Sequence, residues 1–216
     1  MKKSYAVIGL GRFGSSVAAT LFDMDQEVLA MDVDGARVEE MKHRVTLAIQ
    51  ADMRDERALS RLEIQRFDAV LISIGGDVQS SIMATVLCKE LGARYVIAKA
   101  ADPLHAKLLR KVGADKVLLT EREAGVRLAH SLVSESVIDY LELSDEYSVS
   151  EISIPKRWVG HSLDDLKVRN TYDVSVIAIR RGESIMVKID PYEALREKDV
   201  LVVIGENTDI QKIAGL

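Results

Sequence analysis

The first 120 residues alternate between short apolar runs and longer segments of mixed polarity. The runs have the length of buried strands, and the segments between them place apolar side chains at helical spacing. Strands joined by helices of this length pair in parallel through right-handed crossovers. Residues 1–120 are therefore predicted to form an α/β domain with a doubly wound, Rossmann-type parallel sheet. The predicted strands are 5–8, 28–31, 45–49, 68–73, 95–98 and 116–119, and the helices 15–24, 35–43, 54–62, 78–91 and 103–112.

The pattern changes after residue 120. Residues 121–143 carry apolar positions at helical spacing, which predicts one long connecting helix. Residues 144–216 then read as a smaller C-terminal α+β module. With about 70 residues the module is near the lower limit for an independent core, so a second copy of the chain is expected to pair with it. Its predicted strands are 149–154, 174–179, 185–189 and 200–204, and its short helices 162–167 and 208–213.

One stretch of the first domain carries candidate chemistry. The sequence GLGRFG at residues 9–14 follows the first apolar run and opens the first helix, and the second run ends in Asp32. Strand, G-x-G-x-x-G turn, helix, strand and terminal acid in this order form the dinucleotide-binding fingerprint. Gly9 would allow the turn, Gly11 would let a phosphate approach the backbone, and Gly14 would let the helix pack closely. Asp32 would bind ribose hydroxyls and repel a 2′-phosphate, which disfavours NADP.

Composition and charge exclude several classes of partner and site. The net charge is −5, with acidic and basic residues interspersed and no basic stripe, so nucleic acid is not an expected partner. The single cysteine, Cys88, excludes a disulfide within one chain and favours a reducing compartment. No apolar run approaches the ~20 residues of a membrane helix. The few residues before the first strand leave no room for a signal peptide, and the four histidines fit no zinc motif.

The order of these parts resembles a known family, the RCK (regulator of conductance of K⁺) proteins. More narrowly, it resembles the KtrA/TrkA-type cytosolic subunits that gate bacterial potassium transporters. The resemblance covers nearly the whole chain. It implies a nucleotide-sensing regulatory subunit of a Ktr/Trk-type potassium uptake channel and not an enzyme. The segments that carry it are AVIGLGRFG at 6–14, ISIGG at 72–76, IAKA at 97–100, GADKVLLTERE at 113–123 and LELSDEYS at 141–148.

The resemblance implies bound ATP or ADP, with NAD or NADH as the alternative. Arg12 would reach a terminal phosphate, and this favours ATP and ADP because a guanidinium matches the oxygens of such a group. Lys99 would add positive charge near the phosphates. The residues implied are Gly9, Gly11, Arg12, Phe13 and Gly14 in the turn, Asp32 at the ribose with Val33 next to it, Asp52 and Met53 at the adenine, Ile74 and Gly75 beneath the nucleotide, and Lys99.

The resemblance also implies a cation and an assembly. Glu121 occupies the position where relatives hold a divalent or monovalent cation between subunits. The alternative is a first-turn helix charge that complements the helix dipole. Homodimers would assemble into an octameric ring on a membrane potassium channel subunit of the KtrB/TrkH type. The chain would then be cytoplasmic, at the inner face of the cell membrane through this partner.

A second ligand is implied for the C-terminal module, which in relatives can bind cyclic di-AMP at its dimer interface. Close relatives often carry D-I/V-R-A-K/R-Y-G where this chain reads KVRNTYD at 167–173. A plain dimer interface is therefore the alternative. The matching residues are Leu166, Lys167, Val168, Arg169, Asn170, Val176, Ile177 and Pro191.

Two other classes of protein share a dinucleotide fold. An NAD-dependent dehydrogenase would need a proton-handling residue in a substrate domain, and the C-terminal module offers only His161 in a polar turn. A redox-sensing repressor would need a basic winged helix, which neither end of the chain supplies. The sequence therefore predicts a gate that works by different nucleotide affinities in two ring conformations.

Overall fold

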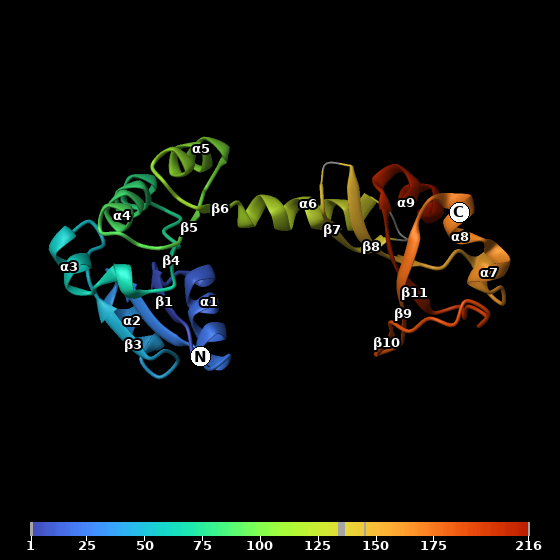
Figure 1. Cartoon of the computed structure of the whole chain (residues 1–216), viewed down its shortest axis with the longest axis horizontal. Coiled ribbons are helices and arrows are strands. Elements are labelled where there is room, and N and C mark those ends of the chain that lie inside the picture. Colours follow the sequence, from blue (N-terminus) through green and yellow to red (C-terminus); the bar gives the residue numbers. More distant parts are fainter. Residues whose placement is uncertain (1, 134–136, 145, 216) are drawn as a thin grey trace. The chain divides into compact units, whose positions relative to one another are not determined.

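The computed structural model describes residues 2–133, 137–144 and 146–215. They fall into two compact units, Met1–Glu121 and Arg122–Leu216, whose elements are labelled in Figure 1. Each unit has its own sheet and its own hydrophobic core. Among the described residues, no helix combines the length and the apolar character needed to cross a membrane.

The first unit confirms the predicted doubly wound parallel sheet. Its strands are β1 Ser4–Ile8, β2 Glu27–Asp32, β3 Leu47–Gln50, β4 Ala69–Ile72, β5 Val96–Lys99 and β6 Lys116–Leu118. Its helices are α1 Arg12–Asp23, α2 Gly35–Met41, α3 Glu56–Arg61, the 3₁₀ turn η1 Ile64–Arg66, α4 Val78–Glu90 and α5 Pro103–Lys111. The strand order is β3-β2-β1-β4-β5-β6, with every pair parallel. The order thus reverses between β1 and β4, where doubly wound sheets bind their ligands.

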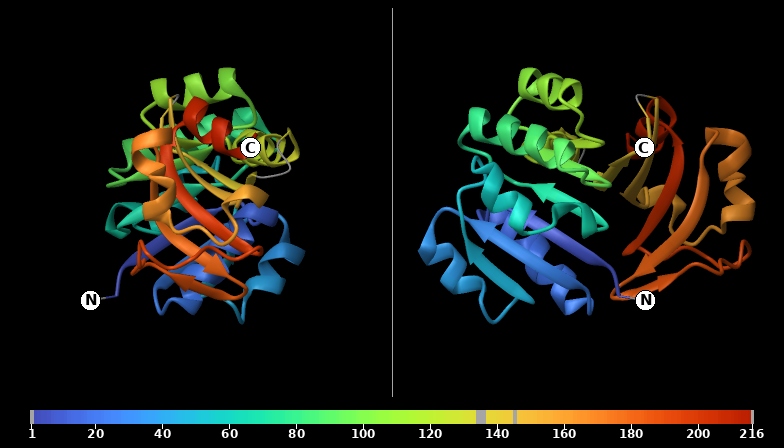
Figure 2. Two further views of the ribbon diagram at one scale, coloured as in Figure 1. Left: turned by 90° about the vertical axis from the view of Figure 1, so that its right-hand side faces the viewer. Right: turned by 60° about the vertical axis from the view of Figure 1, so that its left-hand side comes forward.

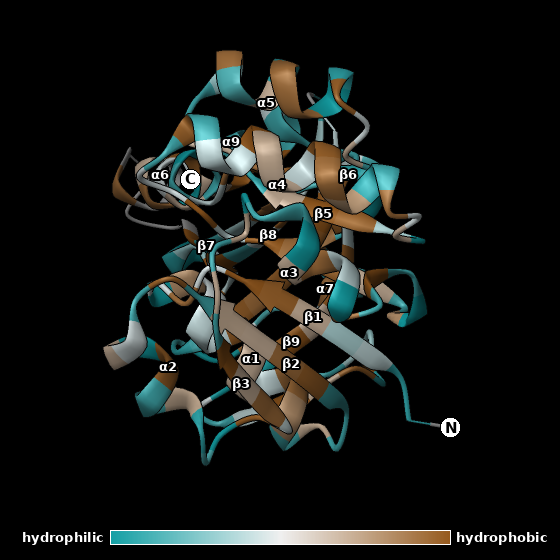
Figure 3. Cartoon of the chain, turned by 90° about the vertical axis from the view of Figure 1, so that its left-hand side faces the viewer, coloured by the Kyte–Doolittle hydropathy of each residue, from teal (hydrophilic) through white to brown (hydrophobic). Residues whose placement is uncertain are grey.

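The helices cover both faces of this sheet. Val7 of β1 packs in a core with α1 and α2, whereas its neighbour Ile8 packs in a second core with α3, α4 and α5. Successive side chains of a strand point to opposite faces, so the strands of a sheet covered on both sides are apolar throughout. Figure 2 gives two further views of these layers, and the strands are mostly brown, hence hydrophobic, in Figure 3.

Aspartates mark the starts of four helices in the first unit. Asp34, Asp55, Asp77 and Asp102 each accept a hydrogen bond from a first-turn amide of α2, α3, α4 and α5. Such caps satisfy backbone donors that have no partner within the helix. The N-cap of α1 is Gly11, and no side chain caps this helix. Only α1 of these five helices therefore leaves its first-turn donors without a side-chain acceptor.

The second unit is the predicted α+β module, with a five-stranded antiparallel sheet in the order β10-β9-β11-β8-β7. Ile152, Trp158 and Leu201 lie fully inside its core. Its strands are β7 Val137–Glu142, β8 Tyr147–Ser153, β9 Ser175–Arg181, β10 Ser184–Met186 and β11 Asp199–Glu206. Its helices are α6 Thr120–Val133, which begins in the first unit, the 3₁₀ turn η2 Lys156–Trp158, α7 Leu163–Leu166, α8 Val168–Tyr172 and α9 Asn207–Ala214.

The prediction of one helix over residues 121–143 is wrong in its second half. Helix α6 ends at Val133, and residues 137–142 form the edge strand β7, paired antiparallel with β8. The intervening residues 134–136 lie outside the described residues. The apolar positions of VIDYLE match a helix as well as a strand, and its β-branched and aromatic residues suit a pleated surface. The choice between helix and strand is made by pairing with β8, which is a contact between two segments of the chain.

A buried ion pair holds two strands of the second unit together. The Asp199 side chain is fully buried, and both of its oxygens accept hydrogen bonds of 2.8 Å from the Arg181 guanidinium. The backbone amide of Arg196 donates a further bond of 2.9 Å. The Arg181 hydrogen bond is the largest cause of a lowered pKa of Asp199. Fully satisfied buried charges of this kind are costly to lose one partner at a time.

Asp199→Asn is expected to lower the free energy of unfolding of the second unit by about 2–4 kcal/mol at pH 7, because Arg181 loses its buried charged partner and keeps only the more exposed Glu193, 2.6 Å away. A lowered carboxyl pKa stabilises the fold above the unfolded value of 3.8 and ceases to do so as pH falls through the folded value. The difference from wild type should therefore shrink at pH 3. Urea unfolding at pH 7 and at pH 3, followed by the fluorescence of Trp158, the only tryptophan in the sequence, measures the difference at each pH.

The exposed Glu197→Gln is the matched control and should unfold as wild type does at both pH values. An Asp199→Asn deficit of equal size at pH 7 and pH 3 would contradict the electrostatic explanation.

Candidate nucleotide-binding site

Two glycines of the turn after β1 are required by the fold itself. The backbone of Gly9 has φ +94°, and a Cβ there would lie 2.9 Å from the carbonyl of Ser73. A Cβ on Gly14 would lie 1.9 Å from the carbonyl oxygen of Gly9, which is a collision. Any side chain at residue 14 would therefore push α1 away from the end of β1. The turn lies where Ile8 pairs with Met31 on one side and Ile72 on the other.

Gly11 has no such internal reason to be a glycine. Its φ is −67°, which every residue type adopts, and a Cβ there would meet nothing within 4 Å. Among the described residues, no acceptor reaches the first-turn amides of Arg12, Phe13 and Gly14. Open space in front of free amides is what a phosphate group needs to bind at a helix N-terminus.

Asp32 lies at the end of β2 and holds the turn from the side. The residue is only 4% exposed. Its carboxylate accepts the Leu10 amide at 2.6 Å and the Asp34 amide at 2.9 Å, and the Arg37 guanidinium lies 3.6 Å away. An ionised carboxylate offers about four acceptor positions, so two amides leave capacity for ribose hydroxyls. The sequence pattern missed the bond to Leu10, by which Asp32 orients the glycine turn.

The residues expected around the adenine differ in how accessible they are. Val33 is 51% exposed, whereas Met53 is 4% exposed and packs in the core of the first unit. A contact between Met53 and a base would therefore come from its backbone. Asp52 forms an ion pair of 2.7 Å with Arg54, and the hydrogen bond from Arg54 is the largest cause of a lowered pKa of Asp52. Ile74, expected beneath the nucleotide, is partly buried against the same core.

The carboxyl ends of β4, β5 and β6 bring further predicted residues close to the glycine turn. The Lys99 ammonium lies 5.8 Å from the ring centroid of Phe13 and 2.5 Å from a carboxylate oxygen of Glu121. A Cβ on Gly75 would lie 3.7 Å from the same ammonium. These four residues come from distant parts of the chain, and the sheet gathers them around one positive charge.

Glu121 is paired in this arrangement. One oxygen accepts from Lys99 and the other from the Thr120 hydroxyl at 2.7 Å, and these two bonds lower its pKa to about 2. The described part of the chain contains no group of three or more His, Cys, Asp or Glu residues suited to a metal ion. The cation expected at Glu121 is therefore not supported by a cluster of such ligands among the described residues, and it stays a prediction.

Arg12 begins α1 and is exposed, and it forms no ion pair with any described residue. Its guanidinium is consequently available to a ligand in solution. Lys99 and Arg12 supply positive charge, and the α1 amides add the partial charge of a helix N-terminus. The arrangement can hold an anionic ligand.

The residues expected to bind cyclic di-AMP lie on α7, α8, β9 and the loop before β11. Val168 is buried in the core, and Leu166 and Val176 pack partly against it. Asp173 has φ +55°, a conformation that favours glycine. The exposed members of the set are Lys167, Arg169, Asn170, Ile177 and Pro191.

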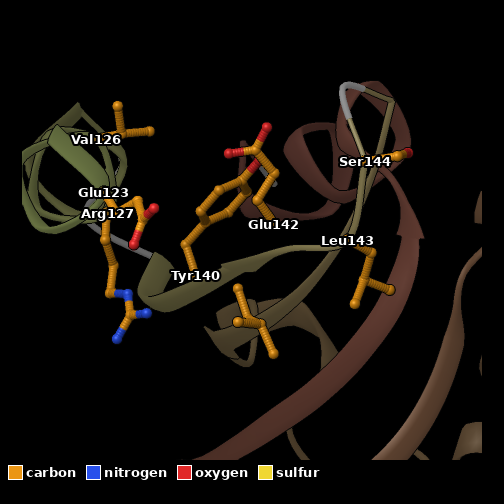
Figure 4. A pocket seen from close by; sticks show the side chains of 8 residues that line it. Glu123, Val126, Arg127, Tyr140, Glu142, Leu143 and Ser144 are labelled. Atoms are coloured by element: carbon orange, nitrogen blue, oxygen red, sulfur yellow. The ribbon is translucent and has the colours of Figure 1, made fainter. Parts of the chain in front are cut away.

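The second unit also contains a cavity that the sequence did not predict. It has a volume of about 390 Å³ and lies between α6 and β7 (Figure 4). Tyr140 projects into it from β7, facing Glu123 and Arg127 of α6 (Figure 4). The expected helix through residue 143 would have left no strand opposite α6. The lining residues are Glu123, Val126, Arg127, Tyr140, Leu141, Glu142, Leu143 and Ser144.

Comparisons with known proteins place this architecture in a family. The TrkA-N domain family matches residues 5–120, and the TrkA-C domain family matches residues 149–216. The chain is 42% identical over 212 residues to Ktr system potassium uptake protein C of Bacillus subtilis (strain 168), covering 98% of this chain and 96% of the relative. It is 38% identical over 210 residues to Ktr system potassium uptake protein A of the same organism, covering 97% and 95%.

Solved structures share the fold at low sequence identity. The GsuK channel bound to NAD has a TM-score of 0.71 and 14% identity, covering 100% of this chain and 40% of that chain. The isolated GsuK RCK domain has a TM-score of 0.70 and 15% identity, covering 100% and 48%. Both the domain matches and the end-to-end identity to the two Bacillus proteins lead to one conclusion: the chain belongs to the TrkA-N/TrkA-C (RCK) family, as its sequence resemblance predicted.

Proposed function

We propose that this chain is the nucleotide-sensing regulatory subunit of a Ktr-type potassium uptake system and has no enzymatic activity. Two relatives that match over nearly the full length are named potassium uptake proteins of the Ktr system. An adenine nucleotide, ATP or ADP, binds at the glycine turn and sets the conformation of an assembled ring. NAD(H) is the alternative, and a channel that shares the fold was solved with NAD.

The observation that carries this proposal is the open space at Gly11. The fold explains the other two glycines of the turn, whereas a side chain at Gly11 would meet no atom of the protein. A ligand that comes within contact distance of the backbone explains this glycine. The free amides of α1, the exposed Arg12 and the ammonium of Lys99 specify that the ligand is an anion.

Regulation requires that the nucleotide bind two conformations with different affinity. ATP and ADP differ in tail length and charge, so Arg12 and Lys99 are the groups that would tell them apart. The proposed assembly is a homodimer that builds an octameric ring on a membrane potassium channel subunit of the KtrB/TrkH type. In the ring, α6 transmits the change because it begins in the first unit and continues into the second.

Cyclic di-AMP is a second proposed ligand, at the dimer interface of the second unit. Its support here is the exposed Arg169, which suits a phosphate, and the exposed apolar Ile177, which suits a purine face. Calorimetric titration with cyclic di-AMP tests it, and Arg169→Gln should weaken any binding. Absence of heat at saturating ligand would leave this face as a plain dimer interface.

Calorimetric titration of the full chain with ATP, ADP and NADH, combined with solution scattering, tests the main proposal. ATP and ADP are expected to bind and to give different scattering profiles. If none of the three nucleotides binds, the sensing function fails. If they bind with identical profiles, the chain binds nucleotide without the proposed switch.

Gly11→Ala and Gly14→Ala are expected to separate binding from folding. Gly11→Ala should change the free energy of unfolding by less than about 1 kcal/mol, because its methyl group enters open space, and should weaken ATP binding about tenfold or more. Gly14→Ala should lower stability by about 1–3 kcal/mol through its collision with the Gly9 carbonyl. Circular dichroism during urea unfolding and calorimetry measure the two effects. Wild-type ATP affinity in Gly11→Ala would contradict the phosphate site.

Arg12→Gln is expected to weaken ATP binding by about tenfold and ADP binding less, because a charge-assisted bond to the terminal phosphate is lost. Arg57→Gln removes an equally exposed arginine on α3 and serves as the control, with unchanged affinities. Calorimetry with both nucleotides gives the ratio of ATP affinity to ADP affinity for wild type and for each variant. Equal losses for ATP and ADP would mean that Arg12 does not read the terminal phosphate.

A further inference from the structure

We propose that Lys99 is a charge switch that exchanges its ion pair with Glu121 for a phosphate of the bound nucleotide. The exchange would connect the glycine turn to the start of α6. This inference rests on the proposed nucleotide site and assigns its regulation to one side chain.

The position of the Lys99 ammonium is the first support. Lys99 is the last residue of β5, and its side chain is 13% exposed, whereas the side chain of Glu121 is 70% exposed. Around it lie the Phe13 ring from the glycine turn, at 5.8 Å, and the Glu121 carboxylate from α6, at 2.5 Å. Gly75, after β4, also borders the ammonium: a Cβ on this glycine would lie 3.7 Å from it, and the glycine itself has no side chain there. One cation thus borders both the turn and α6.

The two competing anions are unequal. Glu121 offers one charge in a largely solvent-exposed position, where water and salt weaken an ion pair. A nucleotide tail on the turn brings several charges next to free amides and a helix N-terminus. A lysine ammonium is a compact charge on a flexible stem with three donors, so it can change partner without moving the backbone. The face of Phe13 attracts the ammonium and keeps it near the turn while it changes partner.

The consequence falls on the first turn of α6. Glu121 is the second residue of this helix, and Lys99 binds it to the end of β5. When Lys99 turns to a phosphate, the Glu121 carboxylate keeps its bond from the neighbouring Thr120 hydroxyl. The ion pair between the end of β5 and the first turn of α6 is then broken, and the covalent link from β6 to α6 remains. The nucleotide is thereby linked to the helix through the loss of a contact.

Because of linkage, the proposal predicts that removing Glu121 and removing Lys99 change nucleotide affinity in opposite directions. If bound nucleotide weakens the Lys99–Glu121 pair, then the pair weakens nucleotide binding by the same factor. Removing Glu121 should therefore tighten binding. A cation held between Glu121 and the phosphate predicts weaker binding of Glu121→Gln only when that cation is present, and a purely structural ion pair predicts no change.

The experiment is calorimetric titration of the full chain with ATP in excess EDTA, so that no divalent cation joins the carboxylate to the phosphates. Glu121→Gln is expected to tighten ATP binding about fivefold or more, and Lys99→Met to weaken it about tenfold or more. In the Lys99→Met background, Glu121→Gln should have no effect, because the competitor has nothing left to compete for. Glu90→Gln and Lys116→Met make the same charge changes at exposed positions on α4 and β6 and should leave affinity unchanged.

A second measurement is hydrogen exchange, and its first comparison, with and without ATP, uses wild type alone. Saturating ATP should speed exchange of the amides at residues 124–126, and Glu121→Gln should abolish this response. The proposal is overturned if Glu121→Gln weakens or leaves ATP affinity unchanged, if its gain persists in Lys99→Met, or if ATP does not alter exchange at α6. Failure of wild type to bind ATP at all is a different result, and it would remove the proposed nucleotide function itself.

Discussion

The close approach of α1 to the end of β1 is the constraint on which the first unit depends. The helix can start there only because residue 14 has no side chain, since a Cβ would lie 1.9 Å from the Gly9 carbonyl oxygen. No side chain caps the helix that starts there, and the space in front of Gly11 is open. The Asp32 carboxylate holds the turn from the second strand through the Leu10 amide. The geometry of the turn is thus a product of backbone packing.

Charges at the carboxyl edge of the sheet follow from the same arrangement. Aspartates cap α2 to α5, whereas no side chain caps α1 and its first turn contains no acid. Lys99 reaches this edge from β5 and is shared between the turn and Glu121. The second unit uses charge differently, since the fully buried Asp199 and the partly buried Arg181 link two strands, and Arg181 also pairs with Glu193.

The family relationship and the geometry support different parts of the functional conclusion. The identity to Ktr system proteins over nearly the whole length concerns the role of the chain in potassium uptake. The free amides, the open space at Gly11 and the cations concern the class of ligand. Helix α6 is continuous from the first unit into the second. It starts at the carboxyl edge of the sheet, so it can carry a local change from one unit to the other.

The sequence by itself determined the α/β domain, the glycine turn, the C-terminal module and the family. These features are local, because the period of the apolar residues and the spacing of the glycines need no knowledge of distant segments. Only the tertiary structure decided that residues 137–142 pair with β8 as a strand and that Met53 and Val168 lie in the cores. It also decided that Lys99 contacts Glu121, 22 positions later in the chain. The physical reason is shared: strand pairing, burial and charge partners depend on contacts between segments far apart in the sequence.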